Sequence, residues 1–268
     1  MSLKDIEETA EEVLLADSER KDEDGKYHPS TLSSCPLKTT LDKMTESEPV
    51  LNSWLLQGSA VHYYLQETGL LDGILHKAGF PVYNTEYEVH RMYNVNDEVT
   101  ITGRCDILTG NDDEQAVIDI KYTSLKPYYD NGRLMKYYSQ VNVYANMFGV
   151  DRFGLFMINS KSNDLTDDGI HMMTGDRDEE NWEMMKQRAI DIHDTLEYWG
   201  WEAGDNPISV SELDPNQTEF WEEQTQFIDT DQCPAYDEEC KYCDFNEVCP
   251  VFQGTMGNGL NQALNQID

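Results

Sequence analysis

Residues 99–123, VTITGRCDILTGNDDEQAVIDIKYT, decide the fold that we expect for this chain. β-Branched and aliphatic residues predict one strand over 99–108 and a second, buried strand over 116–122. The intervening residues 109–113, TGNDD, are typical of a turn and indicate an antiparallel hairpin. A symmetric hairpin centred between residues 112 and 113 places Asp106 opposite Asp119.

These two aspartates predict a metal site. Opposed like charges on one face of a sheet are destabilising unless a positive group lies between them. Carboxylate oxygens suit magnesium or manganese, so a divalent cation resolves the conflict. Lys121 lies two residues beyond Asp119 and points to the same face, where its ammonium can orient water or stabilise charge on a phosphate. The alternative is a surface Asp-x-Lys on an exposed strand.

The other elements follow from hydrophobic periodicity and from start and stop signals. Around the hairpin, their order is helix, three strands, helix, strand, which predicts an α/β fold. We expect three parts: an N-terminal arm or helix (1–30), one domain (31–250) and a tail (251–268). The predicted elements are a helix beginning at Pro36, a helix over 51–70, a strand over 83–92, a helix over 133–148, strands over 153–159 and 169–173, and a helix over 180–201.

The composition is strongly acidic. Asp and Glu number 52 against 19 Lys and Arg, a formal charge of −33, yet 39% of the residues are hydrophobic. This apolar content is sufficient for a folded core and argues against disorder. The charge predicts adaptation to a salt-rich cytoplasm, where counterions screen the repulsion. The alternatives are ordinary acidic solubility and a basic partner.

No apolar run approaches the ~20 residues that a membrane span requires, and the N-terminal stretch is acidic. We therefore expect a soluble, cytoplasmic protein without a membrane partner. In that compartment six cysteines are expected to be thiols or metal ligands rather than disulfides. Four of them lie in the last 36 residues, Cys233, Cys240, Cys243 and Cys249, and this local set suits zinc as readily as iron.

Two helices carry further candidate residues. His62 shares a helix face with Leu55, Gly58 and Leu65, and Gly58 would let another backbone or a metal approach. On the second helix, Gln140 and Tyr144 form an i, i+4 pair beside Tyr137. The alternative for each is ordinary packing and hydrogen bonding in the core.

Four motifs in this order resemble the PD-(D/E)XK nucleases of the RecB-like branch: Gly58-x3-His62, Gly103-Arg104-Cys105-Asp106, Asp119-Ile120-Lys121 and Gln140-x3-Tyr144. The flanking Cys35 and the C-terminal cysteines narrow the resemblance to iron-sulfur members. The chain looks most like the CRISPR-associated RecB-like exonuclease family and its relatives in archaea and their viruses. With the acidic composition, the resemblance implies that the source is a haloarchaeon or its virus. The resemblance implies a restriction-endonuclease-like core, with a central mixed sheet flanked by helices.

The resemblance also implies a role for each motif residue. His62, Asp106, Asp119 and the backbone carbonyl of Ile120 would bind Mg or Mn, and Lys121 would be the catalytic lysine. Gln140 and Tyr144 would assist at the DNA. A 4Fe-4S cluster rather than zinc would join the N- and C-terminal segments, with Cys233 as a spare thiol and Cys105 as a core thiol. Its ligands would be Cys35, Cys240, Cys243 and Cys249.

Two positions depart from the family pattern. Cys105 replaces the proline, and Asp119 stands where Glu is more common, so the shorter side chain puts the metal geometry in doubt.

The predicted function is a metal-dependent deoxyribonuclease that cuts single-stranded DNA from an end. Its setting would be CRISPR adaptation, or replication, recombination and repair, with proteins of those processes as partners. The alternative is a noncatalytic iron-sulfur subunit that binds nucleic acid or acts as a scaffold, against which the intact acid pair argues. Because DNA binding normally needs basic residues, we expect a local positive channel and aromatic stacking. The candidates are Lys126, Arg133, Lys136 and Arg152, with Tyr128, Tyr129, Tyr137 and Tyr138, although these tyrosines are as readily explained as core residues.

Overall fold

The computed structural model describes residues 25–45, 53–68, 70–77, 86–110, 114–124, 131–162 and 169–201, and the single positions 243, 245 and 249. Nine predicted elements are present there, with ends that differ by a few residues. The strands are β1 (Lys26–Tyr27), β2 (Glu86–Asn94), β3 (Thr100–Gly110), β4 (Gln115–Thr123), β5 (Arg152–Asn159) and β6 (Ile170–Asp176). The helices are α2 (Pro29–Leu32), α3 (Pro36–Met44), α4 (Ser53–Glu67), α5 (Leu70–Lys77), α6 (Asn131–Phe148) and α7 (Glu179–Tyr198).

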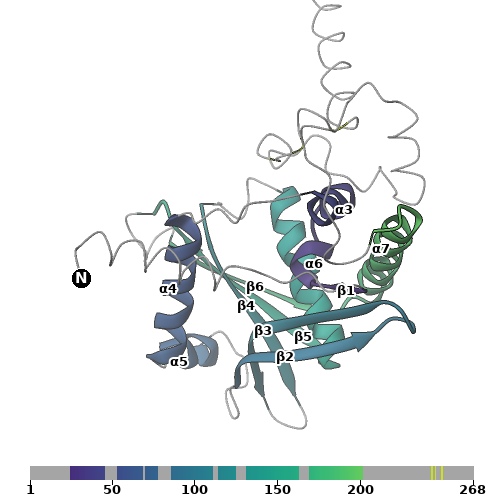
Figure 1. The fold of residues 1–268 in the computed structure, drawn as a ribbon. Helices are drawn as coiled ribbons and strands as arrows, with labels where there is room; N and C mark the ends of the chain where they lie inside the picture. The colour runs from purple at the N-terminus through teal and green to yellow at the C-terminus, as the bar shows by residue number, and fades with distance from the viewer. Residues whose placement is uncertain are drawn as a thin grey trace, which may run out of the picture.

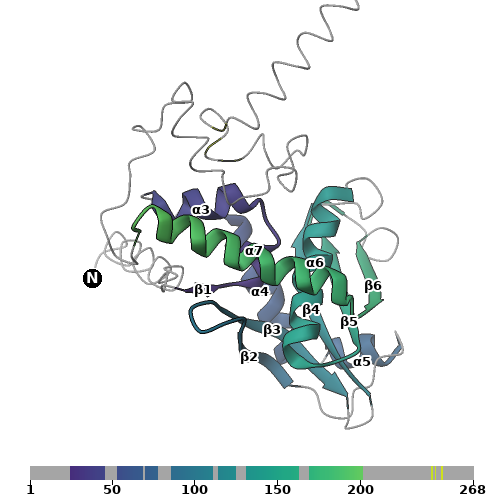
Figure 2. The same cartoon turned by 90° about the vertical axis from the view of Figure 1, so that its right-hand side faces the viewer.

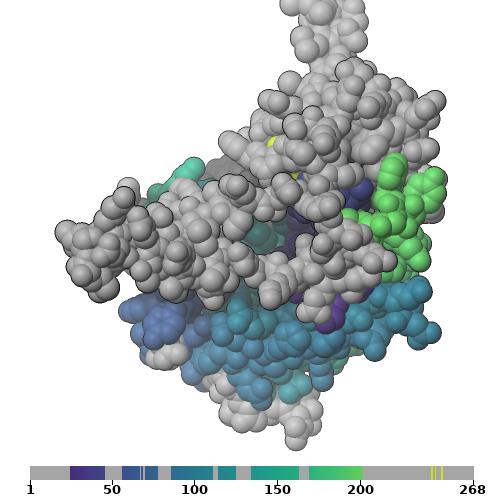
Figure 3. Space-filling view, viewed as in Figure 1, coloured from purple at the N-terminus to yellow at the C-terminus, as the bar shows by residue number. Residues whose placement is uncertain are grey.

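The strands form one mixed sheet in the order β1-β3-β4-β5-β6, with β2 paired to the other edge of β3 (Figure 1). β4 and β5 run parallel, while the β2–β3, β3–β4 and β5–β6 pairs are antiparallel. The helix α6 joins the parallel strands, as a crossover connection requires. β2 and β3 form a continuous band across the face seen in Figure 3. This is the α/β fold with a mixed sheet that the sequence predicts.

Two hydrophobic clusters cover the two faces of this sheet. One contains Val141 of α6, Trp182 of α7 and Val117 of β4. The other contains Leu65 of α4, Leu71 of α5 and Ile118 of β4. Figures 1 and 2 show the same division, with α4 and α5 apart from α6 and α7. Consecutive residues of β4 therefore enter different clusters, which explains why this strand is apolar almost throughout.

The hairpin has the predicted register. Ile107 pairs with Ile118, and the ladder continues to Gly110 and Gln115. The ladder stops at Ile107 and Ile118, so Asp106 and Asp119 stand at the first position beyond it. β2 pairs along one edge of β3. Because β1 pairs with Thr100 and Ile101 from the opposite edge, β1 and β4 lie on the same edge of β3. The two aspartates lie in the fork between β3 and β4.

The N-terminal segment joins the fold earlier than expected. β1 pairs in parallel with β3, and Tyr27 is fully buried, so the domain includes residues before the expected boundary at 31. The reason is a contact with a strand far along the chain, which local periodicity does not reveal. Residues 1–24 of the expected arm (1–30), the tail over 251–268 and most of the segment after 201 lie outside the described residues.

The predicted 51–70 helix is followed at once by α5, a second helix that the sequence analysis did not separate. Among the helices of the described ranges, none combines the length and the apolar character that crossing a membrane demands.

Candidate active site

The fork between β3 and β4 brings together the predicted acidic residues. Asp119 is buried, whereas Asp106 is partly exposed. The Asp106 Oδ2 atom accepts a hydrogen bond from the Ile120 backbone N–H at 2.6 Å. Its Oδ1 atom lies 3.5 Å from Nδ1 of His62 on α4. Asp106 thereby links the strand that carries it to β4 and to α4.

Lys121 lies on the same face as Asp119, as the alternation along β4 requires. Its Nζ atom is 2.7 Å from Asp119 Oδ2, and that oxygen has no further hydrogen-bond partner among the described residues. The other oxygen, Oδ1, accepts a hydrogen bond from Nε2 of Gln140 at 3.4 Å. The ammonium also lies 5.3 Å from the centre of the Tyr137 ring. Lys121 is thus held between a carboxylate and an aromatic face.

The pKa values of Asp119, Lys121 and His62 reflect two carboxylates that share one largely buried site. Burial raises the pKa of Asp119 to about 6; Lys121 opposes this rise and Asp106 adds to it. Burial lowers the pKa of Lys121, but the two aspartates outweigh that effect and raise it. The pKa of His62 is also raised, because its contact with Asp106 outweighs burial. Lys121 is therefore protonated at neutral pH.

Gln140 and Tyr144 project from α6 toward the same site, as their i, i+4 spacing predicts. Both side chains are buried, and burial together with the two aspartates raises the pKa of the Tyr144 hydroxyl. Gly103 of β3 makes room for them. A Cβ atom there would lie 2.9 Å from Cε1 of Tyr144 and 2.8 Å from Cδ of Pro29. Gly103 is needed for this close packing.

Two features of the site were missed by the sequence analysis. Gln66, one turn after His62, has its Nε2 atom 3.5 Å from the Asp106 carbonyl oxygen, at the long limit of a hydrogen bond. Glu88 of β2 would face Asp106 in the β2–β3 register but makes no pair there, and its φ of 53° lies in the left-handed region. The spacing of Gln66 from His62 was a usable signal. Nothing in the sequence marks Glu88.

The expectation for Gly58 is not met, because a Cβ atom there would meet no atom within 4 Å in the described structure. Cys105 is a buried core thiol, as expected, and burial raises its pKa to about 12. Tyr138 packs edge-on against Phe153 at 5.0 Å and belongs to the core rather than to a DNA surface.

Of the other residues that were predicted to contact DNA, some lie at the site and others do not. Arg152 is paired with Glu114 at 2.6 Å, at the opposite end of β4 from Lys121, so it does not extend a positive channel at the fork. Tyr137 is the one proposed stacking residue that the described structure puts at the site. Nothing is described of the Arg133 side chain, and Lys126, Tyr128 and Tyr129 lie outside the described residues.

The donor set is of the right type for a divalent cation. It offers two carboxylates and an imidazole. Burial, and to a smaller extent repulsion from Asp106, raises the pKa of Asp119, and a bound cation would favour its charged form. The carboxylates are turned toward protein donors, and within the described ranges no three His, Cys, Asp or Glu side chains converge closely enough to hold a metal. The residues fit a cation in chemistry, and binding one requires the carboxylates to rotate.

Two of the predicted cluster cysteines, Cys35 and Cys249, lie close enough to Cys243 for their charges to affect its pKa. Cys35 is the N-cap residue of α3. Burial raises the pKa of Cys243, the Lys38 ammonium lowers it, and the thiolates of Cys35 and Cys249 raise it further. Phe245 is buried and lies under Lys38, 5.7 Å from Nζ to the ring centre. The C-terminal positions therefore lie against α3, whereas Cys240 and Cys233 lie outside the described residues.

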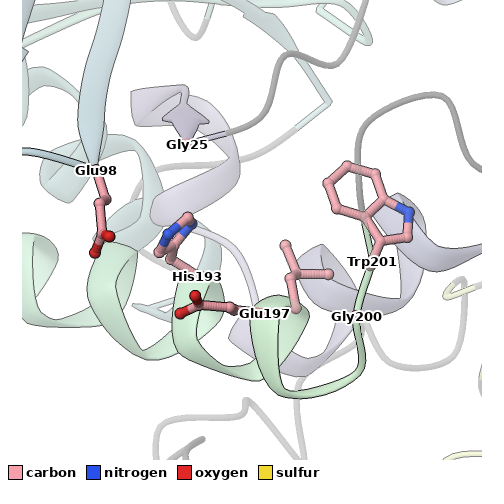
Figure 4. A pocket seen from close by; sticks show the side chains of 7 residues that line it. Gly25, Glu98, His193, Glu197, Gly200 and Trp201 are labelled. Carbon is pink, nitrogen blue, oxygen red and sulfur yellow. The ribbon is translucent and has the colours of Figure 1, made fainter.

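A separate cavity of about 410 Å³ lies beside the C-terminal half of α7. His193, Glu197 and Trp201 line it together with Glu98 from the turn before β3 (Figure 4). The Tyr27 hydroxyl lies 3.2 Å from Nδ1 of His193. None of the predicted site residues lines this cavity.

A family model for the PD-(D/E)XK nuclease superfamily matches residues 74–250. The chain belongs to this superfamily. The match includes Asp106, Asp119 and Lys121, and it begins after Cys35 and His62. No curated protein matches the chain.

One solved structure shares the fold at low identity, and others are similar with lower scores. The protein SSO0001 superposes with a TM-score of 0.51 and 17% identity, over 90% of this chain and 96% of its own. A phage-related exonuclease from Haemophilus somnus 129PT gives a TM-score of 0.45 and 16% identity, over 66% and 97%. An alkaline exonuclease from Laribacter hongkongensis gives 0.45 and 12%, over 70% and 96%.

Proposed function

We propose that the protein is a Mg- or Mn-dependent deoxyribonuclease that hydrolyses phosphodiester bonds of single-stranded DNA from an end. Superfamily membership supports the nuclease. The observation that carries the assignment to this site is the Asp119–Lys121 ion pair beside Asp106, in the fork where the β3–β4 ladder ends. A degenerate scaffold would have no reason to keep two carboxylates and an ammonium in a mostly buried site, because burying charges is costly.

In this proposal, His62, Asp106, Asp119 and the Ile120 carbonyl hold the cation. When bound, the cation neutralises charge on the scissile phosphate and lowers the pKa of a coordinated water. Lys121 keeps its proton, because the two aspartates raise its pKa. It therefore acts as a fixed positive charge that orients the nucleophile and stabilises the developing negative charge, rather than as a general base.

Gln140 and Tyr144 serve the same site from α6. Gln140 holds Asp119 through Oδ1, which leaves Oδ2 directed to Lys121. Tyr144 is protonated at neutral pH because its pKa is raised, so its hydroxyl can act as a hydrogen-bond donor. In this proposal Gln140 keeps the Asp119 carboxylate in one orientation, and Tyr144 supports Gln140 through their side-chain hydrogen bond.

The second cofactor in the proposal is a 4Fe-4S cluster on Cys35, Cys240, Cys243 and Cys249. The effect of Cys35 on the pKa of Cys243 supports Cys35 as the distant ligand. Such a cluster would join α3 to the C-terminal segment and stabilise that closure. A zinc ion on the local set with Cys233 is the alternative.

The setting follows from the same proposal: a cytoplasmic enzyme of a haloarchaeon or its virus, working in CRISPR adaptation or in replication, recombination and repair. The charge of −33 is what supports the salt-rich setting. DNA is its substrate, and proteins of those processes are its partners.

The test compares linear and circular single-stranded DNA, with the linear strand labelled at either end. Wild-type protein with Mn²⁺ should shorten linear DNA from one end and leave the circle intact, and EDTA should stop the reaction. Asp106→Asn should abolish cleavage without unfolding the protein. Cleavage of the circle would contradict the exonuclease, and undiminished cleavage by Asp106→Asn would contradict the site.

A further inference from the structure

Helix α4 exposes an unusual amount of apolar surface. Leu56, Tyr63 and Tyr64 are 50%, 68% and 59% exposed, and Leu70 at the start of α5 is 49% exposed. These are four of the nine large hydrophobic side chains that are exposed in the described ranges. Scattered exposed apolar residues need no explanation, whereas a contiguous group marks an interaction site.

The group lies on one flank of the helix. Leu56 and Tyr63 are seven residues apart, which is two turns, and Ala60 between them is also exposed. Tyr64 lies next to Tyr63 and one turn after Ala60. We refer to Leu56, Ala60, Tyr63 and Tyr64 as the α4 flank.

The α4 flank adjoins the candidate active site. His62, the neighbour of Tyr63, contacts Asp106 at 3.5 Å. Gln57, the neighbour of Leu56, accepts a hydrogen bond from the Tyr122 hydroxyl at 3.3 Å, and Tyr122 follows Lys121. α4 therefore contacts Asp106 through His62, and it contacts β4 through Gln57 and Tyr122, whose side chain lies on the opposite face of β4 from Lys121. Because a helix with its side chains is about 10 Å across, the flank is within a few nucleotides of a phosphate bound at Lys121.

We propose that the α4 flank is a stacking platform for the bases of single-stranded DNA, with Tyr63 and Tyr64 as the stacking residues. The inference rests on the proposed nuclease function and assigns the surface that would hold its single-stranded substrate, since the bases of a duplex are not free to stack on side chains. Two tyrosines offer π-faces to any base, so the platform needs no particular sequence.

The negative charge of the chain favours a ligand that is held by base stacking, as single-stranded DNA would be on the α4 flank. A net charge of −33 opposes the approach of a phosphate backbone, and phosphate contacts weaken as salt increases. Stacking and apolar burial do not depend on released counterions. An aromatic platform next to the site therefore supplies affinity that an acidic nuclease cannot draw from its net charge.

The test measures binding of a fluorescent oligo-dT, in EDTA, to the full chain carrying Asp119→Asn, which the proposed function predicts to be inactive. Adding Tyr63→Ala should weaken binding about 5-fold or more, as loss of one stacked base predicts, and Tyr63→Phe should restore it because the ring remains. The matched control is Tyr198→Ala, which removes a 54% exposed tyrosine from α7. The fold loss should be the same in low and in molar KCl.

Each other outcome has a definite meaning. Equal binding by Tyr63→Ala and the Asp119→Asn parent overturns the platform while leaving the nuclease intact. Loss of a dimer on Tyr63→Ala, seen by sedimentation, assigns the flank to a second copy and also overturns it. If the parent binds no single-stranded DNA and wild type cleaves none, the proposed function fails together with the platform.

Discussion

The buried Asp119 carboxylate makes a specific prediction about stability and pH. In the protein without added metal, its pKa of about 6 exceeds the value of 3.8 expected for an unperturbed Asp. The folded state therefore binds more protons than the unfolded state between these two pH values. The stability contribution of Asp119 is lowest above pH 6 and increases as the pH falls through this window.

The magnitude follows from the shift. A difference of about 2 pKa units, at 1.36 kcal/mol each, amounts to about 3 kcal/mol. The variant Asp119→Asn has no such titration, and Lys121 stays protonated throughout. The difference in unfolding free energy between wild type and Asp119→Asn should therefore change by about 3 kcal/mol from about pH 8 to about pH 4, in favour of wild type at low pH.

Urea unfolding in EDTA and constant KCl measures this difference. Lys121→Met serves as a second test, in which the dependence should become larger: removing the ammonium that lowers the pKa of Asp119 should extend the pH dependence upward beyond pH 6. The double variant Asp119→Asn/Lys121→Met should lose the dependence. Parallel stability profiles for wild type and Asp119→Asn would show that the carboxylate is not buried beside Asp106 as described.

Three further predictions concern the effect of salt on stability, the turn between α2 and α3, and the iron-sulfur cluster. The melting temperature should rise steeply with KCl, because screening relieves the repulsion of a −33 charge; a flat or falling curve would favour an acidic surface made for a basic partner. Arg188 is buried and donates to the carbonyls of Leu32 and Ser34 at 2.7 and 3.1 Å, so Arg188→Met should cost about 2–4 kcal/mol in urea unfolding, and a neutral result would refute this role. Protein purified without oxygen should contain iron and sulfide that Cys35→Ser removes and Cys233→Ser does not; zinc, or the reverse pattern, would overturn the ligand set.

Local patterns in the sequence were sufficient for the centre of the fold. The hairpin register was predictable because turn-forming residues separate the two strands, and a turn centred between residues 112 and 113 aligns Asp106 with Asp119, as the observed pairing of Ile107 with Ile118 requires. The i, i+4 spacing of Gln140 and Tyr144 correctly placed both on the face of α6 that meets the site.

Features that depend on distant parts of the chain were not predictable in this way. β1 forms only through its pairing with β3, and Arg188 reaches a carbonyl 154 residues away. The left-handed Glu88 reflects an interruption of the β2–β3 ladder opposite Asp106, which no propensity signals. Arg152 was predicted to contact DNA, but it forms an ion pair with Glu114, 38 residues away in the sequence, which no local pattern indicates.

The most direct test of the central claim is the single-turnover rate at which Lys121→Met cleaves a single-stranded oligonucleotide, with Mn²⁺ binding measured on the same sample. If Lys121 is the fixed positive charge of a metal-dependent site, the variant should bind Mn²⁺ and cleave roughly 100-fold to 1,000-fold more slowly than wild type. A variant that binds Mn²⁺ and cleaves at the wild-type rate would contradict the account.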